Sequence, residues 1–195
     1  MKIIRKHVFE TNSSSMHALV ISKSEENLET PTELCLAWDG GYSWENEVYA
    51  DQINKFTYLG ILAAGIQETE VNNELENYFE KLKEIGFTIG NDDYGNSEKE
   101  IKKKLLKSYD YYIDHEDEAY GAYMSIVYDE ERLKRFMLSP RSFITTGNDN
   151  DGDAIWSKPN AIFELGLKYE ETKWGTKQYF TEDLEKDYEI YHKGN

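Results

Sequence analysis

Residues 5–22 read RKHVFETNSSSMHALVIS and set a run of polar side chains between two apolar segments. Residues 16–21 predict a strand covered on both faces, because apolar residues follow one another there with little polar alternation. The apolar flanks hold both ends of the polar run 11–15, so we expect a hydrogen-bonded turn. Phe9 and Leu19 are then expected to be buried on either side of that turn.

The composition limits the class of protein. The chain has 195 residues, 14% of them aromatic, which is enough for the core of one domain. Its 38 acidic and 22 basic residues give a net charge of −16. Such a chain repels nucleic-acid phosphate and attracts basic protein surfaces, so we expect no direct nucleic-acid binding.

Cysteine usage and hydropathy indicate the compartment. Cys35 is the single cysteine, which excludes an intramolecular disulfide and a cysteine zinc site. No apolar run approaches the length of a membrane span, and the N-terminus lacks the apolar core of a signal peptide. We therefore expect a cytoplasmic protein with no membrane association.

The pattern of elements predicts an α+β fold, a single compact domain over residues 1–195 with a mixed, mostly antiparallel sheet and about four helices. Apolar stripes predict helices at 45–64 and 71–85, the second ended by Gly86, and helices capped by Ser97 and Asp129. A last short helix is expected at 182–191. The expected strands are 16–21, 33–38 with Trp38 on its apolar face, 87–89, 123–127, 142–146, 161–169 and 177–180.

Three polar segments carry a resemblance. FETNSSSMH at 9–17 resembles the opening of a family of small, functionally uncharacterised proteins of bacteriophages and their bacterial hosts. IDHE at 113–116 and FITTGNDN at 143–150 are similar to later segments of that family. The resemblance implies a phage-related origin and carries no mechanism.

The same segments hold groups that suit a small enzyme acting on a nucleotide or another phosphorylated small molecule. His17 and His115 are candidate bases, with Asp114 to orient a histidine. Hydroxyl and amide groups are candidate ligands for phosphate or a base edge. The ligand-binding candidates are Asn12, Ser13, Ser14, Ser15, Asn148, Asp149 and Asn150.

A structural interpretation of these residues stays open. Ser, Thr, Asn and Asp also build turns and caps through local hydrogen bonds, and histidines are often simply hydrogen-bonded. GNDNDGD at 147–153 does not fit a calcium loop, because Lys158 stands where the bidentate Glu belongs. We expect no metal site and no cofactor.

Clustered carboxylates favour a second function, a binding protein. Acidic residues gather at 68–84, at 114–118 and at 182–189. They form either a solvated face or a surface that docks in a basic groove. With the phage-like opening, the second reading predicts an inhibitor of a host nucleic-acid-handling or defence complex, such as a CRISPR complex. The partner-binding candidates are Glu74, Glu76, Glu80, Glu116, Asp117 and Glu118.

Overall fold

The computed structural model describes residues 15–38, 40–43, 47–70, 73–90, 97–107, 110–114, 119–148, 168–172, 175–179 and 186–193. Within these residues it confirms the α+β class, with five helices and a four-stranded antiparallel sheet in the order β10-β1-β7-β4. The sheet strands are β10 (Tyr188–Lys193), β1 (Ser15–Ser22), β7 (Phe143–Asn148) and β4 (Val48–Tyr49).

Shorter strand pairs complete the described β structure. The parallel pairs are β2 (Glu33–Leu34) with β5 (Thr88–Ile89) and β3 (Gly40–Tyr42) with β6 (Tyr111–Ile113). The antiparallel pair is β8 (Lys168–Thr172) with β9 (Gly175–Tyr179). The helices are α1 (Gln52–Glu70), α2 (Glu74–Glu84), α3 (Glu98–Lys107), α4 (Tyr120–Val127) and α5 (Glu130–Leu138).

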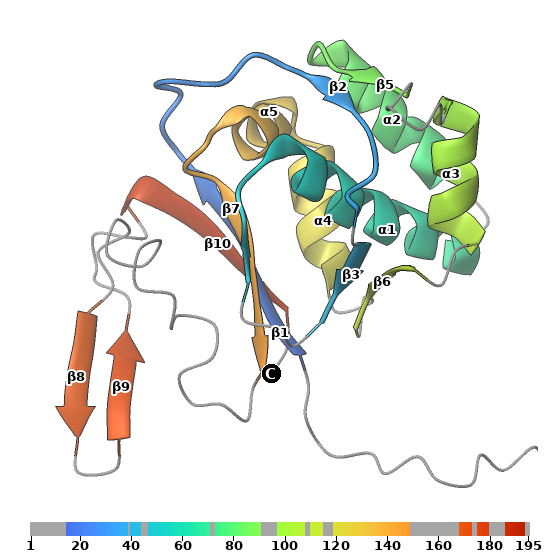
Figure 1. The fold of residues 1–195 in the computed structure, drawn as a ribbon. Coiled ribbons are helices and arrows are strands. Elements are labelled where there is room, and N and C mark those ends of the chain that lie inside the picture. The colour runs from blue at the N-terminus through green and yellow to red at the C-terminus, as the bar shows by residue number, and fades with distance from the viewer. Residues whose placement is uncertain are drawn as a thin grey trace, which may run out of the picture.

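β1 is buried on both faces, as its continuous apolar sequence predicts. Leu19 and Ile21 belong to the main core cluster with the helices, whereas Ala18 and Val20 belong to a second, smaller cluster. The helices lie together on one side of the sheet (Figure 1). The predicted burial of Leu19 is confirmed, at 0% exposed. Phe9 and residues 11–14 of the expected turn lie outside the described residues.

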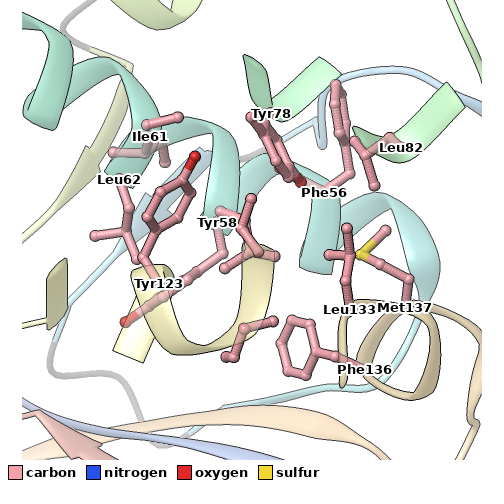
Figure 2. Packing of buried hydrophobic residues seen from close by; sticks show 14 of the residues in the cluster. Phe56, Tyr58, Ile61, Leu62, Tyr78, Leu82, Tyr123, Leu133, Phe136 and Met137 are labelled. Atoms are coloured by element: carbon pink, nitrogen blue, oxygen red, sulfur yellow. The ribbon is translucent and has the colours of Figure 1, made fainter. Parts of the chain in front are cut away.

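α1 forms the centre of the helical layer. Its side chains are buried on nearly every side, as expected for a helix that other elements surround. Figure 2 shows Phe56, Tyr58 and Leu62 of α1 with Tyr78 of α2 and Tyr123 of α4 in one cluster. Burying aromatic side chains of this size supplies a large share of the hydrophobic stabilisation.

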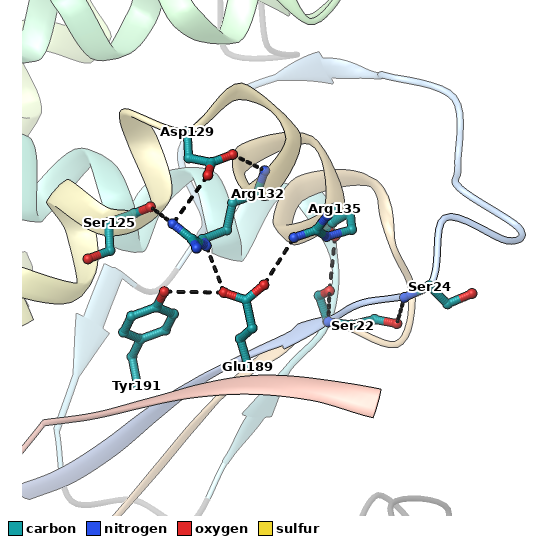
Figure 3. A network of polar contacts seen from close by, with 9 residues as sticks. Ser22, Ser24, Ser125, Asp129, Arg132, Arg135, Glu189 and Tyr191 are labelled. Carbon is teal, nitrogen blue, oxygen red and sulfur yellow. Dashed lines mark hydrogen bonds and ion pairs between the residues drawn. The ribbon is translucent and has the colours of Figure 1, made fainter. Parts of the chain in front are cut away.

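α5 is fastened to β10 by an ion-pair cluster (Figure 3). Arg132 Nε donates to Glu189 Oε2 at 2.7 Å, and Arg135 Nη2 donates to Glu189 Oε1 at 3.0 Å. Asp129 accepts from the backbone N–H of Arg132 at 3.0 Å, which confirms it as the N-cap. The cluster ties β10 to the helical layer.

Four element predictions were wrong. The strand 33–38 is limited to Glu33–Leu34, and Trp38 is 87% exposed. The helix 45–64 begins only at Gln52, after β4. Residues 123–127 are helical, because their buried positions recur at helical spacing with Ala122. Of the helix expected at 182–191, residues 186–187 are helical, but 188–193 form a strand that pairs with β1.

Candidate functional site

His17 lies in β1 and is fully buried. Its Nε2 lies 3.0 Å from the carbonyl oxygen of Ser43, and its Nδ1 lies 2.9 Å from the hydroxyl of Tyr58. A carbonyl only accepts, so Nε2 donates its hydrogen to Ser43, while Nδ1 is hydrogen-bonded to the hydroxyl of Tyr58. Burial also raises the pKa of Tyr58, which keeps that hydroxyl protonated. His17 is thus a buried, internally bonded imidazole that presents no accessible nitrogen to a substrate.

The described residues of the three polar segments are linked through β1 and β3. Ser15 pairs with Asn148 across β1 and β7. The backbone N–H of Asp114 donates to the carbonyl of Tyr42 at 3.2 Å, and Ser43 is the residue that His17 contacts. The start of β1 and the ends of β3, β6 and β7 therefore meet, as Figure 1 shows. We call this region the strand-end junction.

The remaining predicted site residues lie outside the described residues. These are Asn12, Ser13, Ser14, His115, Glu116, Asp117, Glu118, Asp149 and Asn150. Among the described residues, no group of three or more His, Cys, Asp or Glu side chains is placed to hold a metal ion. No described helix is long and apolar enough to cross a membrane.

Glu74 does not belong to an accessible acidic face, which corrects its assignment as a partner-binding residue. It is 3% exposed, at the start of α2. Its carboxylate accepts the hydroxyl of Tyr123 at 2.8 Å and the hydroxyl of Tyr128 at 2.8 Å. Desolvation and this carboxylate together raise the pKa of Tyr123. The charge of Glu74 is used inside the protein, where it joins α2 to α4.

The two other predicted partner-binding acids of α2 are exposed. Glu76 forms an ion pair with Lys102 of α3, and Lys102 also donates to Glu98 at 2.8 Å. Glu80 lies on the same exposed side of α2. Exposed ion pairs of this kind contribute little to stability. The acidic face of α2 is thus partly neutralised by α3 and retains Glu80 and Glu84.

Sequence reasoning missed a pocket of about 480 Å³. It lies beside β3 and β6 and is lined by Ala37, Trp38, Gly41, Glu47, Tyr49, Asn54 and Tyr112. We call it the aromatic pocket. Trp38 is 87% and Tyr112 48% exposed. Exposed large aromatics that gather at one hollow mark a binding surface more often than they mark a core.

Two glycines of β3 leave space for the rings of two tyrosines of β6. A Cβ on Gly40 would lie 1.9 Å from the ring of Tyr111, and a Cβ on Gly41 would lie 2.8 Å from the ring of Tyr112. Each tyrosine therefore covers the glycine that pairs with it in the parallel register. The signal in the sequence was the combination of a Gly-Gly pair with a Tyr-Tyr pair, which local turn rules assign to a simple turn.

The wall of the pocket is held by the core. The ring of Tyr49 meets Tyr42 edge to face, with centroids 5.0 Å apart. The Tyr42 hydroxyl donates to both the carbonyl and the side-chain Oδ1 of Asn54, at 3.0 Å each. Asn54 Nδ2 donates to Asp51 Oδ2 at 2.9 Å. Both polar ends of the Asn54 side chain are thus engaged within the protein.

Lys55 is a second unexpected group, buried in α1. Its Nζ donates to the carbonyl of Ser139 at 2.9 Å and lies 5.8 Å from the ring centroid of Phe136. Burial lowers the pKa of Lys55 to about 7, although Glu29 and Asp51 act in the opposite direction. It does not line the aromatic pocket. Its role in this structure is to hold the end of α5 against α1.

Comparison of the chain with protein-family models, curated proteins and solved structures gives no match.

Proposed function

We propose that this chain is an acidic binding protein that occupies a basic surface of a host nucleic-acid-handling or defence complex, for example a CRISPR complex. The observation that carries the proposal is the net charge of −16 on a folded α+β body. Carboxylates are exposed along the described surface, including those of Glu25, Glu26, Glu80 and Glu84. The resemblance of 9–17 to phage proteins points to the same class of function.

Electrostatics explains why the partner is a basic protein surface. A strongly negative surface speeds encounter with a positive one and suppresses encounter with bare nucleic acid. Among the described residues, His17 has both ring nitrogens engaged inside the protein, so it does not support the alternative of an enzyme that uses His17 as its base. The resulting association should weaken steeply with ionic strength.

Affinity capture with a salt series tests this proposal. The tagged full chain is expressed in bacterial cells and captured at about 0.05 M and about 0.5 M salt, between which the Debye length falls several-fold. We expect one stoichiometric basic partner at low salt, lost at high salt, whose nucleic-acid binding the purified chain inhibits. If no basic partner is captured at low salt, or if its nucleic-acid binding is unaffected, the proposal is wrong.

Matched charge variants locate the contact. Glu80→Gln with Glu84→Gln removes two exposed charges from α2, and Glu25→Gln with Glu26→Gln removes two from the loop after β1. Both pairs change the net charge by +2, so the two double variants would weaken binding equally if total charge alone decided the affinity. We expect the α2 pair to weaken binding more, because α2 belongs to the predicted partner-binding face.

The strand-end junction favours a second candidate, a small enzyme acting on a nucleotide or another phosphorylated small molecule. The specific observation is that Ser15 pairs with Asn148, while Asp114 bonds to the strand β3 whose end contacts His17 of β1. A panel of nucleotides and sugar phosphates, screened by thermal shift, tests it. A stabilising ligand whose effect Asn148→Ala removes would support the enzyme. No shift across the panel would leave the binding function as the better account.

A further inference from the structure

The aromatic pocket has an uncommon chemistry for a hollow of its size. Three aromatic side chains, those of Trp38, Tyr49 and Tyr112, line it together with Glu47. Its volume of about 480 Å³ lies in the range of small-ligand sites. Among the described residues that line it, Glu47 is the one that carries a charge, and that charge is negative. The faces of aromatic rings also carry negative potential, so both kinds of lining group favour a cation.

The same chemistry disfavours the anionic ligands that aromatic pockets often hold. Among the described residues that line the pocket there is no Lys or Arg, so a phosphate group would meet the negative charge of Glu47 and the negative field of the chain. A neutral base would need a polar group to read its edge. Asn54 is the lining amide, and its Oδ1 and Nδ2 already bond to Tyr42 and Asp51. A nucleotide or nucleoside therefore fits poorly.

We propose that the aromatic pocket receives an arginine side chain of a basic protein partner, stacked against Trp38 or Tyr112 and paired with Glu47. This inference rests on the proposed function, since it names the group of the basic surface that the chain recognises. Trp38 and Tyr112 are exposed at 87% and 48%, so a partner reaches them without unfolding any described element. Tryptophan, tyrosine and arginine are the residues that most often dominate binding energy at interfaces.

Arginine fits this pocket better than lysine for geometric reasons. Its planar guanidinium stacks on an aromatic face and at the same time presents a fork of donors to a carboxylate. A lysine ammonium is a strongly hydrated point charge that uses only one of these two features at full strength. The tyrosine that forms one wall, Tyr49, packs edge to face on the buried Tyr42, so that wall is pre-formed.

Titration of the purified full chain with capped tripeptides tests the inference. The probes are acetyl-Gly-Arg-Gly-amide, its citrulline counterpart, which is the neutral isostere, and its lysine counterpart. The readout is the indole N–H resonance of Trp38 in a ¹⁵N spectrum, assigned from the Trp38→Phe variant. We expect the arginine peptide to shift this resonance with a dissociation constant on the order of 1 mM, a value typical of a single anchoring side chain.

Matched variants separate the pocket from the general charge of the chain. Trp38→Ala and Glu47→Gln should each weaken arginine-peptide binding, Trp38→Ala by about tenfold, the factor that loss of one good cation–π contact gives. Because Trp38→Ala lacks the indole, its peptide binding is measured from the shifts of backbone amide resonances beside the pocket. Glu131→Gln changes the net charge by the same amount as Glu47→Gln but lies on α5, away from the pocket lining, so it should leave the affinity unchanged.

Several outcomes would overturn the inference. Equal shifts with the citrulline peptide would show that charge is not read. Tighter binding of adenosine than of the arginine peptide would assign the pocket to a base, and no shift of the Trp38 resonance at several millimolar would mean no binding. If the arginine peptide binds but affinity capture yields no basic partner, the proposed function fails while the pocket chemistry stands. If a partner is captured equally well by Trp38→Ala, the function stands and the pocket is not its contact.

Discussion

The surroundings of His17 and the aromatic pocket are built on the same short strand, β3, and use their side chains in opposite ways. Next to the end of β3, Ser43 and the buried Tyr58 satisfy both nitrogens of His17. At Gly41 of β3, Trp38 and Tyr112 remain exposed around an open hollow. The most polar motif of the chain thus contributes a buried, satisfied group, and an inconspicuous Gly-Gly segment contributes the accessible surface. Polarity in a sequence is therefore a poor guide to accessibility.

The largest expected effect on stability comes from a change at the buried His17. His17→Ala removes a fully buried ring and leaves the Tyr58 hydroxyl and the Ser43 carbonyl without their bonds to it. We expect a loss of about 3 kcal/mol in the free energy of unfolding, from the cavity and the lost hydrogen bonds together. Urea unfolding followed by circular dichroism measures it.

Trp38→Ala is the matched change at the exposed aromatic pocket. Because Trp38 is 87% exposed, its removal should alter the free energy of unfolding by less than about 0.5 kcal/mol. Equal losses in the two variants would contradict the distinction between a buried structural histidine and an exposed tryptophan.

Lys55 gives the next largest effect, a rise of stability with pH. The pKa of Lys55 is lowered to about 7 in the folded chain and returns to the ordinary 10.5 on unfolding. Between these values the unfolded chain binds more protons, so stability rises as pH increases from about 7 toward 10.5. The slope approaches about 1.4 kcal/mol per pH unit at most.

The variant Lys55→Met isolates this effect. Buried tyrosines such as Tyr58 have raised pKa values, so their ionisation in the unfolded chain opposes the rise above about pH 10. The difference between the wild-type chain and Lys55→Met cancels that contribution. Urea unfolding at pH 7, 8 and 9 should show Lys55→Met more stable at pH 7, with the gap closing as pH rises. A constant gap would mean that Lys55 keeps an ordinary pKa.

Local signals allowed much of the fold to be predicted. The Ser97–Glu100 capping pair is present, with Glu100 Oε2 accepting from the backbone N–H of Ser97 at 2.8 Å. Gly86 has a φ of +102° just after α2, as a helix-ending glycine should. Asp129 caps α5 as predicted. Each of these depends on residues within four positions of one another, which is the range that sequence pattern reports well.

The two regions around β3 depend on distant contacts instead. His17 meets Tyr58, 41 positions away, and the pocket combines residues from Ala37 to Tyr112. Trp38 was assigned to a strand face because it alternates with Leu34 and Leu36, but that strand ends at Leu34. Composition and periodicity contain no information on which of several buried or exposed environments a given aromatic will enter.

Glu74 and Glu80 test the same distinction within one helix, with a smaller expected effect. Glu74→Gln replaces a buried carboxylate that accepts two tyrosine hydroxyls by an amide whose single oxygen accepts less strongly. We expect a loss of about 1.5 kcal/mol, the usual scale for hydrogen bonds to a charged group. Glu80→Gln, which is exposed, should change stability by less than about 0.5 kcal/mol. Urea unfolding of both variants decides whether Glu74 is structural.

The smallest expected effect concerns the floor of the pocket. A Cβ on Gly41 would lie 2.8 Å from Tyr112 Cε1, so the Tyr112 ring must move in Gly41→Ala. Tyr112 is 48% exposed and its ring has room to swing outward, so we expect a stability loss below about 1 kcal/mol. The shape of the pocket should change nonetheless, which weakens arginine-peptide binding.

Gly40→Ala serves as the contrast, because its Cβ would lie 1.9 Å from the ring of Tyr111, whose hydroxyl donates to the carbonyl of Ala37 at 3.2 Å. This hydrogen bond holds the Tyr111 ring in place, so Gly40→Ala should unfold at a lower urea concentration than Gly41→Ala. The reverse order would show that Tyr112, not Tyr111, is the ring that β3 and β6 need in place.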